Sequence, residues 1–290
     1  MNAQRFWNAN GFAIAVALNP PKGSDVSVLV AQTEPLRGRI DAVLVGDATD
    51  AIMRMTPLAA CAALSAKGMR AILGMNGRDR NRLAVQGDLL GAWSLGVRDV
   101  LFEDGKDPSF GDHPLTRPVH DVDGMALVEL AAALNRGRDG AGLELAGGTD
   151  FNIAAAVEWL DDDTEIEREF VRMGELARKG CSTFVVSPQF DAARTRALVE
   201  RARPLGAAVL VGVIMLKSVG MARYLNEVPG ISRVPDHVIE RLASAETKAR
   251  AGVLAAAEFI DAMKGIADGV VIEPVGWVHK IPEILDAIVR

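Results

Sequence analysis

The feature that most constrains the fold is a series of eight short apolar runs, each long enough for one β-strand, separated by longer stretches of helical character. The runs are nearly continuous in apolar residues, which is typical of strands buried on both faces of a parallel sheet. They cover residues 12–18, 42–46, 70–75, 98–103, 151–157, 183–187, 208–213 and 269–273. The sequence therefore predicts eight parallel strands.

Helical patterns lie between these runs, and several of them end at a glycine, as helix C-termini often do. The predicted helices cover residues 57–67, 82–95, 163–179, 235–263 and 281–289. Strand plus helix, repeated eight times, favours an α/β fold, a closed (β/α)8 TIM barrel formed by residues 1–290 as a single domain. An open doubly wound sheet is the alternative.

The composition narrows the class of protein and of partner. The formal net charge of −6 offers no basic face for nucleic acid or for an anionic membrane. No apolar run reaches the roughly 18 residues that a membrane span needs. Cys61 and Cys181 are isolated, with no ligand spacing for a metal, and two such thiols suit a reducing compartment. We expect a cytoplasmic protein without a metal site.

In a barrel of this kind the active site lies at the carboxyl ends of the strands. Polar residues follow the apolar runs at Asn19, Asp47, Asn76, Glu103, Asp104, Glu158, Ser187, Gln189 and Glu273. Solvated loop residues are the alternative for many of these, because any strand must end in something polar. Glu103 and Asp104 are adjacent carboxylates directly after a buried strand, so repulsion would raise the pKa of one. They are the predicted catalytic residues.

The longest irregular segment, residues 104–123, is a candidate functional loop. It contains His113 and His120, whose spacing has no meaning for a metal site and which we expect at the surface. Asp79 precedes a helix and is a candidate N-cap. We expect the four tryptophans, Trp7, Trp93, Trp159 and Trp277, to serve core or rim packing, and only Trp159 is placed where it could face a planar ligand.

Several short motifs follow the apolar runs in order. They are Pro20-Pro21-Lys22-Gly23, Arg78-Asp79-Arg80-Asn81, the segment 86–92, Asp104 with Gly111-Asp112-His113-Pro114, the segments 217–226 and 228–231, and Gly276-Trp277. Over residues 12 to 288 this series resembles the methylenetetrahydrofolate reductases. The resemblance implies a TIM barrel that binds FAD and folate at the carboxyl ends of its strands.

The chain departs from that family at functional positions. The glutamate that donates a proton in the family, three residues before its Pro-Pro pair, is Ala17 here. The family's glycine before Asp104 is Glu103, and its basic pair on a later helix is Glu175 and Leu176. A diphosphate would meet added negative charge and would lose its basic partners. FAD is therefore implied by the resemblance but disfavoured by these residues.

Site residues carried over from the resemblance fall into two groups. The implied substrate-binding residues are Asp104, Ser187, Gln189, Asn19 and Met221. The positions implied for a cofactor are Gly46, Asp47, Gly74, Asn76, Phe102, Val119, Asp121 and Glu158.

Three functions remain open on these grounds. The first is reduction of 5,10-methylene- to 5-methyl-tetrahydrofolate, with a tetrahydrofolate-type pterin as substrate and NAD(P)H as a candidate electron donor. The second is a folate-dependent methyl or one-carbon transferase. The third is a non-catalytic folate-binding subunit of a one-carbon complex. The expected partners are a small-molecule folate and either a second copy of the chain or a partner subunit.

Overall fold

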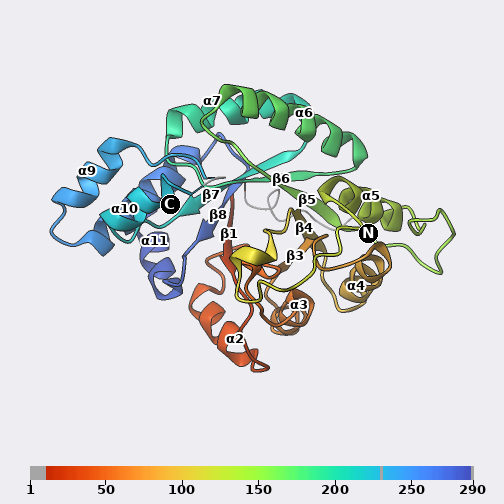
Figure 1. Ribbon diagram of the computed structural model, residues 1–290. Helices are drawn as coiled ribbons and strands as arrows, with labels where there is room; N and C mark the ends of the chain where they lie inside the picture. The colour runs from red at the N-terminus through yellow and green to blue at the C-terminus, as the bar shows by residue number, and fades with distance from the viewer. Residues whose placement is uncertain (1–10, 229–230, 289–290) are drawn as a thin grey trace.

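The protein is described by a computed structural model, which covers residues 11–228 and 231–288. Trp7, the middle of the motif at 228–231 and the end of the predicted last helix lie outside these residues. Eight parallel strands form one closed barrel in chain order, as the sequence predicted (Figure 1). They are β1 (Ala13–Leu18), β2 (Ala42–Val45), β3 (Ala71–Asn76), β4 (Asp99–Glu103), β5 (Asn152–Val157), β6 (Thr183–Val186), β7 (Ala208–Ile214) and β8 (Gly269–Glu273).

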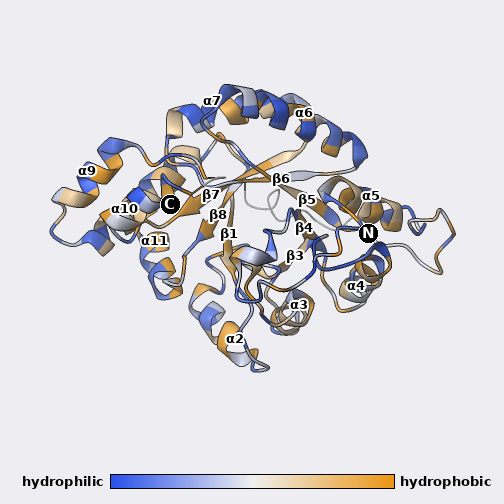
Figure 2. Cartoon of the chain, in the orientation of Figure 1, coloured by the Kyte–Doolittle hydropathy of each residue, from blue (hydrophilic) through white to orange (hydrophobic). Residues whose placement is uncertain are grey.

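Helices surround the barrel and cover its outer face (Figure 1). They are α2 (Ser27–Thr33), α3 (Pro57–Ala66), α4 (Arg82–Ser94), α5 (Gly124–Asn135), α6 (Asp163–Lys179), α7 (Ala192–Ala202), α8 (Val219–Leu225), α9 (Asp236–Ser244), α10 (Lys248–Met263) and α11 (Ile281–Ala287). The predicted helix at 163–179 is confirmed, and α2, α5, α7 and α8 were not predicted. Figure 2 shows apolar strands inside and hydrophilic outer faces on α6 and α7.

The single long helix predicted over residues 235–263 is wrong, because the chain forms α9 and α10 there instead. Ala245 and Thr247 adopt extended backbone between the two helices. Each helix buries a different apolar face: α9 packs Ile239 and Leu242 into a small cluster at the end of β7, whereas α10 packs against the barrel. One straight helix could not place both faces at once.

The interior of the barrel is filled by alanines together with larger aliphatic side chains. Its inward apolar cluster is Ala13, Ala15, Ala42, Leu44, Ile72, Leu101, Ala154, Leu210 and Val271. Below it, the buried Asp99 carboxylate accepts hydrogen bonds from Arg70 Nε at 2.6 Å and from Asn152 Nδ2 at 2.8 Å. These satisfied polar groups close the amino-terminal end of the barrel, so ligand access is left to the carboxyl-terminal end.

The segment between β4 and α5 is irregular apart from one 3-10 turn, η3 (Pro108–Phe110), as the sequence predicted. Within residues 11–228 and 231–288, no helix combines the length and the apolar character needed to cross a membrane.

Candidate functional site

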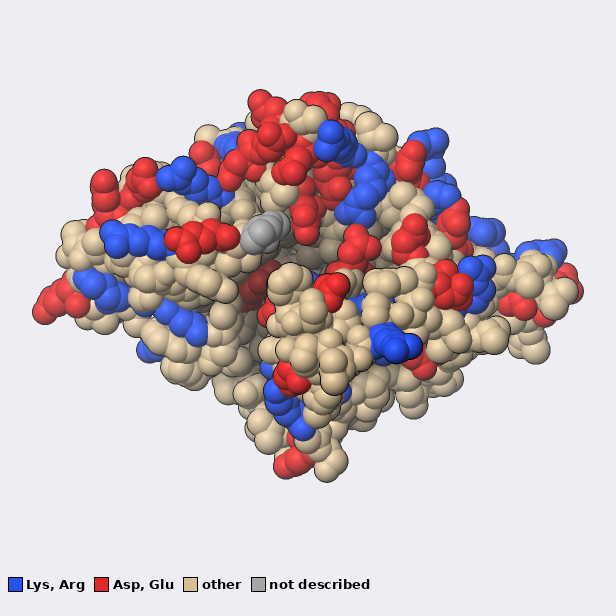
Figure 3. Space-filling model, viewed as in Figure 1, with Lys and Arg blue, Asp and Glu red and all other residues tan. Residues whose placement is uncertain are grey.

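A cavity of 240 Å³ opens at the carboxyl-terminal end of the barrel. The ends of β1, β2, β3, β4 and β8 and the loops that follow β2 and β8 supply its walls. The lining residues are Ala17, Leu18, Asn19, Leu44, Gly46, Thr49, Asp50, Gly74, Leu101, Glu103, Glu273, Pro274 and Val275. We call it the mouth cavity. Figure 3 shows a hollow near the centre of the molecule with acidic side chains around it.

Glu103 ends β4 and lines the mouth cavity, as expected for a catalytic candidate. Burial raises the pKa of its carboxyl to about 7, with smaller contributions from the charges of Asp47 and Glu273. A backbone hydrogen bond from Asp47 and the charge of Arg78 oppose that shift in pKa. A carboxyl with this pKa can both give and take a proton near neutrality.

Glu273 ends β8 and is the second carboxyl of the mouth cavity. Burial raises its pKa to about 7, with a further contribution from the charge of Asp50 and an opposing one from Lys106. The sequence marked Glu273 as a polar strand end but did not assign it to the site. The sequence pattern placed Glu273 at the end of a strand, but only the closed barrel shows which residues lie next to it.

Glu273 lies beside the position at which the family's acid is replaced by Ala17. The β1–β8 register pairs Val16 with Ile272, so Ala17 and Glu273 are the next residues along two adjacent strands. Both line the mouth cavity. Adjacent strands are about 4.8 Å apart. A carboxyl missing from β1 is therefore present one strand away and faces the same space.

Asp47 and Asn76, both implied as cofactor positions, belong to one buried network at the ends of β2 and β3. The Asn76 backbone N–H donates to Asp47 Oδ2 at 3.1 Å, and Asn76 Nδ2 donates to the Asp47 carbonyl at 3.0 Å. Arg80 Nη1 donates to Asp47 Oδ2 at 2.6 Å. None of these three side chains lines the mouth cavity, and their polar groups are bonded to one another.

Three of the remaining implied positions line the mouth cavity: Gly46, Gly74 and Asn19. Gly74 has a clear physical reason, because a Cβ there would lie 2.6 Å from the Val45 carbonyl oxygen. A Cβ at Gly46 would lie 2.4 Å from Thr49 Oγ1 and 2.9 Å from Asn19 Oδ1. These two strand ends pack too closely for a side chain.

The β5–β6 side of the barrel holds Ser187 and Gln189, implied as substrate-binding. Gln189 is buried, and its Nε2 donates to the Trp159 carbonyl at 2.9 Å and to the Ser187 carbonyl at 3.1 Å. Ser187 Oγ accepts from the Trp159 backbone N–H at 3.1 Å. Both side chains brace the turn after β5, and neither lines the mouth cavity.

Trp159 serves core packing, as expected, and does not face the mouth cavity. Its side chain is fully buried, and its ring stacks on Phe170 of α6 with centroids 6.0 Å apart. Glu158, the residue before it, is exposed at the strand end. Burial raises the pKa of Glu158, helped by the charges of Glu169 and Asp104 and opposed by Arg172.

Asp104, expected to bind substrate, is exposed at the rim beyond β4. Its Oδ1 lies 3.2 Å from the position that a Cβ at Gly124 would occupy, at the start of α5. Glu103 and Asp104 therefore separate: Glu103 faces into the mouth cavity, and Asp104 lies outside its lining. Contact between Asp104 and a ligand stays a prediction.

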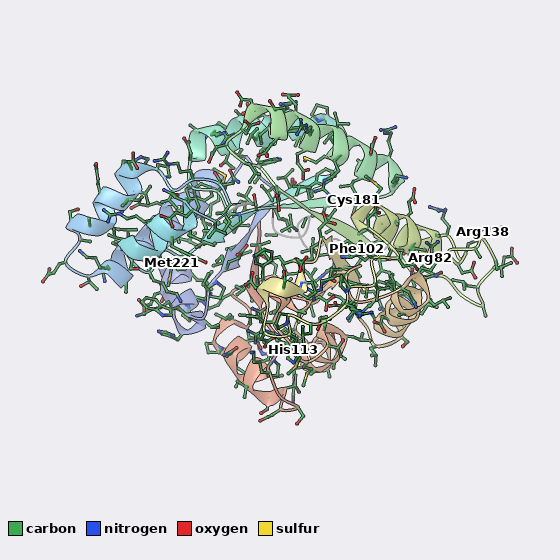
Figure 4. The ribbon with its side chains drawn as sticks, viewed as in Figure 1. Arg82, Phe102, His113, Arg138, Cys181 and Met221 are labelled. Carbon is green, nitrogen blue, oxygen red and sulfur yellow. The ribbon has the colours of Figure 1, made fainter. Side chains whose placement is uncertain are left out.

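The other implied residues lie away from the mouth cavity. Phe102 packs between the sheet and the helices, and Met221 belongs to the small cluster around α8 and α9. Figure 4 shows these two side chains on opposite sides of the barrel. Val119 is exposed, and Asp121 forms an ion pair with Arg82 at 3.1 Å.

The structure also tests the expectations for Asp79 and for the two histidines of the loop before α5. The N-cap of α4 is Asn81, whose side chain accepts from Leu83 and Ala84, while Asp79 pairs with Arg78; the assignment of Asp79 was wrong. His113 and His120 are exposed, as expected. Within the described part of the chain, no group of three or more His, Cys, Asp or Glu side chains is placed to hold a metal ion.

Solved structures similar to this chain share its fold. EDTA monooxygenase (EmoA) from Chelativorans sp. BNC1 aligns with a TM-score of 0.56 and 11% identity, over 95% of this chain and 94% of that one. DmoA from Hyphomicrobium sulfonivorans aligns with a TM-score of 0.55 and 10% identity, over 96% and 87%. Long-chain alkane monooxygenase (LadA) aligns with a TM-score of 0.53 and 11% identity, over 95% and 90%.

Because their sequence identities to this chain are low, these structures establish only the fold. Comparison of the sequence itself identifies the family. No curated protein sequence matches the chain. The family described as methylenetetrahydrofolate reductase matches residues 3–273, which include every strand of the barrel and the Ala17 and Glu273 positions. The chain belongs to the methylenetetrahydrofolate reductase family.

Proposed function

We propose that the protein binds a tetrahydrofolate-type pterin at the mouth cavity and reduces its 5,10-methylene group to a 5-methyl group, with Glu273 as the proton donor. The observation that carries this proposal is the position of Glu273, one strand away from Ala17 and facing the same cavity. A carboxyl at this place with a pKa raised to about 7 can supply the proton that Ala17 cannot.

The reaction needs one proton and one hydride. Opening the five-membered ring breaks the bond between the methylene carbon and N10, and N10 takes the proton from Glu273. The methylene carbon, now an iminium cation, then accepts a hydride from a reduced nicotinamide dinucleotide, the co-substrate of the proposal. Solvent returns the proton to Glu273. With a pKa of about 7, the Glu273 carboxyl is part-protonated at neutral pH.

Glu103 acts as the partner carboxyl in this proposal. Its pKa is also about 7, and the charge of Glu273 contributes to that value. Two coupled carboxyls share their protons, so one can be protonated while the other is ionised. An ionised Glu103 would stabilise the iminium cation while Glu273 donates.

FAD does not fit the mouth cavity as described. Among its lining residues there is no lysine or arginine, and Glu103 and Glu273 bring carboxyls into it. Leu176, in place of a family basic residue, is fully buried on α6. No step of the proposal uses a flavin.

The experiment moves the carboxyl between strands. Turnover of methylenetetrahydrofolate with NADH and with NADPH is measured for the parent, Glu273→Ala, and the double variant Glu273→Ala with Ala17→Glu. Loss of a general acid typically costs about 10²- to 10⁴-fold in rate. We expect Glu273→Ala to lose that much and the double variant to recover a large part, because the carboxyl returns to the family's position.

Glu144→Gln is the matched control, because this glutamate side chain is 85% exposed and does not line the mouth cavity. Turnover of the parent that is unaffected by Glu273→Ala would exclude Glu273 as the acid. A parent that binds folate without turnover with either nucleotide would favour the non-catalytic subunit.

A further inference from the structure

A second cavity, of 330 Å³, lies beside the mouth cavity and is not used by the proposed reaction. Residues of the turn after β2 separate the two: Gly46, Thr49 and Asp50 line the mouth cavity, while Asp47, Ala48 and Ala51 line the second. The opposite wall comes from the start of α3 and from the segments around Arg78 and His113. We call it the side cavity.

The side cavity is lined by three arginines, two of which are neutralised. Arg78 is buried, pairs with Asp79, and donates from Nη1 to the Lys106 carbonyl at 2.8 Å. Arg80 pairs with Asp47 at 2.6 Å and with Asp88 at 2.9 Å. These two side chains build the wall and have few donors left for a ligand.

Arg54 is different, because it lines the side cavity without a carboxylate partner among the described residues. Its Nη1 donates to the Pro20 carbonyl at 3.1 Å. Its Nε is buried and has no hydrogen-bond partner. Burying part of a guanidinium without an anion is costly, since charge and N–H donors both lose water. Its Nη2 has no hydrogen-bond partner among the described residues, so an anion in the side cavity can pair with the guanidinium there.

The start of α3 adjoins the same wall. Thr56, the N-cap residue, lines the side cavity, and its side chain makes no capping hydrogen bond. Pro57 has no N–H, so the unbonded donors of the first turn belong to Leu58 and Ala59. The positive end of a helix dipole favours an anion at this place. The helix dipole and the unpaired charge of Arg54 would both attract an anion.

We propose that the side cavity binds the phosphate group of a small anion, held by Arg54 and the start of α3. A planar guanidinium fork and first-turn N–H groups match the oxygens of a phosphate. The phosphate comes either from solution, as inorganic phosphate, or as part of a reduced nicotinamide dinucleotide. His113, exposed at the edge of the cavity, and Thr116 are further donors for the same group.

Calorimetric titration of the full chain in phosphate-free buffer tests this proposal. The probes are inorganic phosphate, inorganic pyrophosphate and NADH, added separately. We expect Arg54→Gln to weaken binding of the effective probe by about tenfold or more, the size expected for a charge-assisted hydrogen bond. Arg54→Lys keeps the charge and should keep part of the affinity.

Arg138→Gln is the control, because Arg138 is exposed and paired only weakly with Glu144 at 3.8 Å. Figure 4 shows it at the right-hand edge of the molecule, away from His113. Thermal melts without the probe confirm that each variant folds. With the probe, the parent, Arg54→Lys and Arg138→Gln should gain stability, because each keeps a positive charge at position 54, whereas Arg54→Gln should gain less.

Binding of inorganic phosphate would assign the site to a free anion, and binding of NADH alone would assign it to the dinucleotide. Either result supports the proposal if Arg54→Gln weakens that binding. Equal binding by parent and Arg54→Gln, or no binding of any probe, overturns it. No folate and no turnover enter this measurement, so its outcome is separate from that of the proposed reaction.

Discussion

Single carboxyl groups dominate the chemistry of the mouth cavity. Glu103 and Glu273 each reach a pKa of about 7 because they are withdrawn from water, and neighbouring acidic groups add to the shift. A raised carboxyl pKa means that the folded protein holds its protons to higher pH than the unfolded chain does. The two groups therefore weaken the fold when they ionise, and this cost is absent while both are protonated.

The pH dependence of stability follows with a definite sign. Between the ordinary glutamate pKa of 4.5 and the folded value of about 7, the free energy of unfolding should fall as pH rises. Glu103→Gln cannot ionise, so relative to the parent it should gain about 1–2 kcal/mol between pH 5 and pH 8, a figure reduced because water reaches the cavity. Urea denaturation of both proteins at the two pH values measures this.

Glu144→Gln again provides the comparison, since an exposed glutamate should show no such change with pH. A Glu103→Gln difference of the same size at pH 5 and pH 8 would mean that Glu103 titrates normally.

At the scale of elements, helix packing depends on close contacts that tolerate only glycine. Gly252 of α10 lies against the loop after β7, where a Cβ would be 1.9 Å from the Leu216 carbonyl oxygen. This contact lets α10 approach the barrel while α9 packs elsewhere. Gly87 of α4, by contrast, is exposed with nothing near its Cβ position.

The two helical glycines make a matched pair. Gly252→Ala should destabilise the protein by about 1–3 kcal/mol, the usual cost of overpacking. Gly87→Ala should stabilise it by about 0.5–1 kcal/mol, because alanine restricts the unfolded chain and adds no clash. Chemical denaturation of both variants measures the difference. Similar effects of the two substitutions would show that α10 shifts without cost.

At the scale of the whole molecule, charge separates the two cavities. The chain has a formal net charge of −6, and the mouth cavity contains carboxyls without a lining lysine or arginine among its described residues. The side cavity contains the unpaired Arg54. A neutral or cationic ring system suits the first, and an anionic group suits the second.

We therefore expect the protein to be purified without FAD. A diphosphate near Glu103 and Glu273 meets like charge, and at a separation of about 4 Å each such pair costs about 1–4 kcal/mol between bulk water and an intermediate dielectric. The visible absorption spectrum of the purified protein, before and after added FAD and gel filtration, measures retention. Stoichiometric flavin in the untreated protein would contradict this expectation.

Local pattern alone identified much of this protein. Continuous apolar runs marked all eight strands, because burial on both faces leaves a signal within each run. The same runs located Glu103 and Glu273 at strand ends, and the motifs indicated the family. Breaks within helical segments were predicted less well: residues 235–263, expected as one helix, form two helices.

The tertiary structure decided what depends on contact between distant segments. Ala17 and Glu273 lie 256 positions apart, 273 minus 17, and become neighbours only because β1 pairs with β8 when the barrel closes. Within the described part of the chain Arg54 has no carboxylate partner, because the carboxylates that line the side cavity, Asp47 and Asp79, pair with Arg80 and Arg78. The residue pattern of a segment shows whether that segment is buried. Which side chains share one cavity depends on strand pairing across the whole chain, and this pairing is fixed only when the barrel closes.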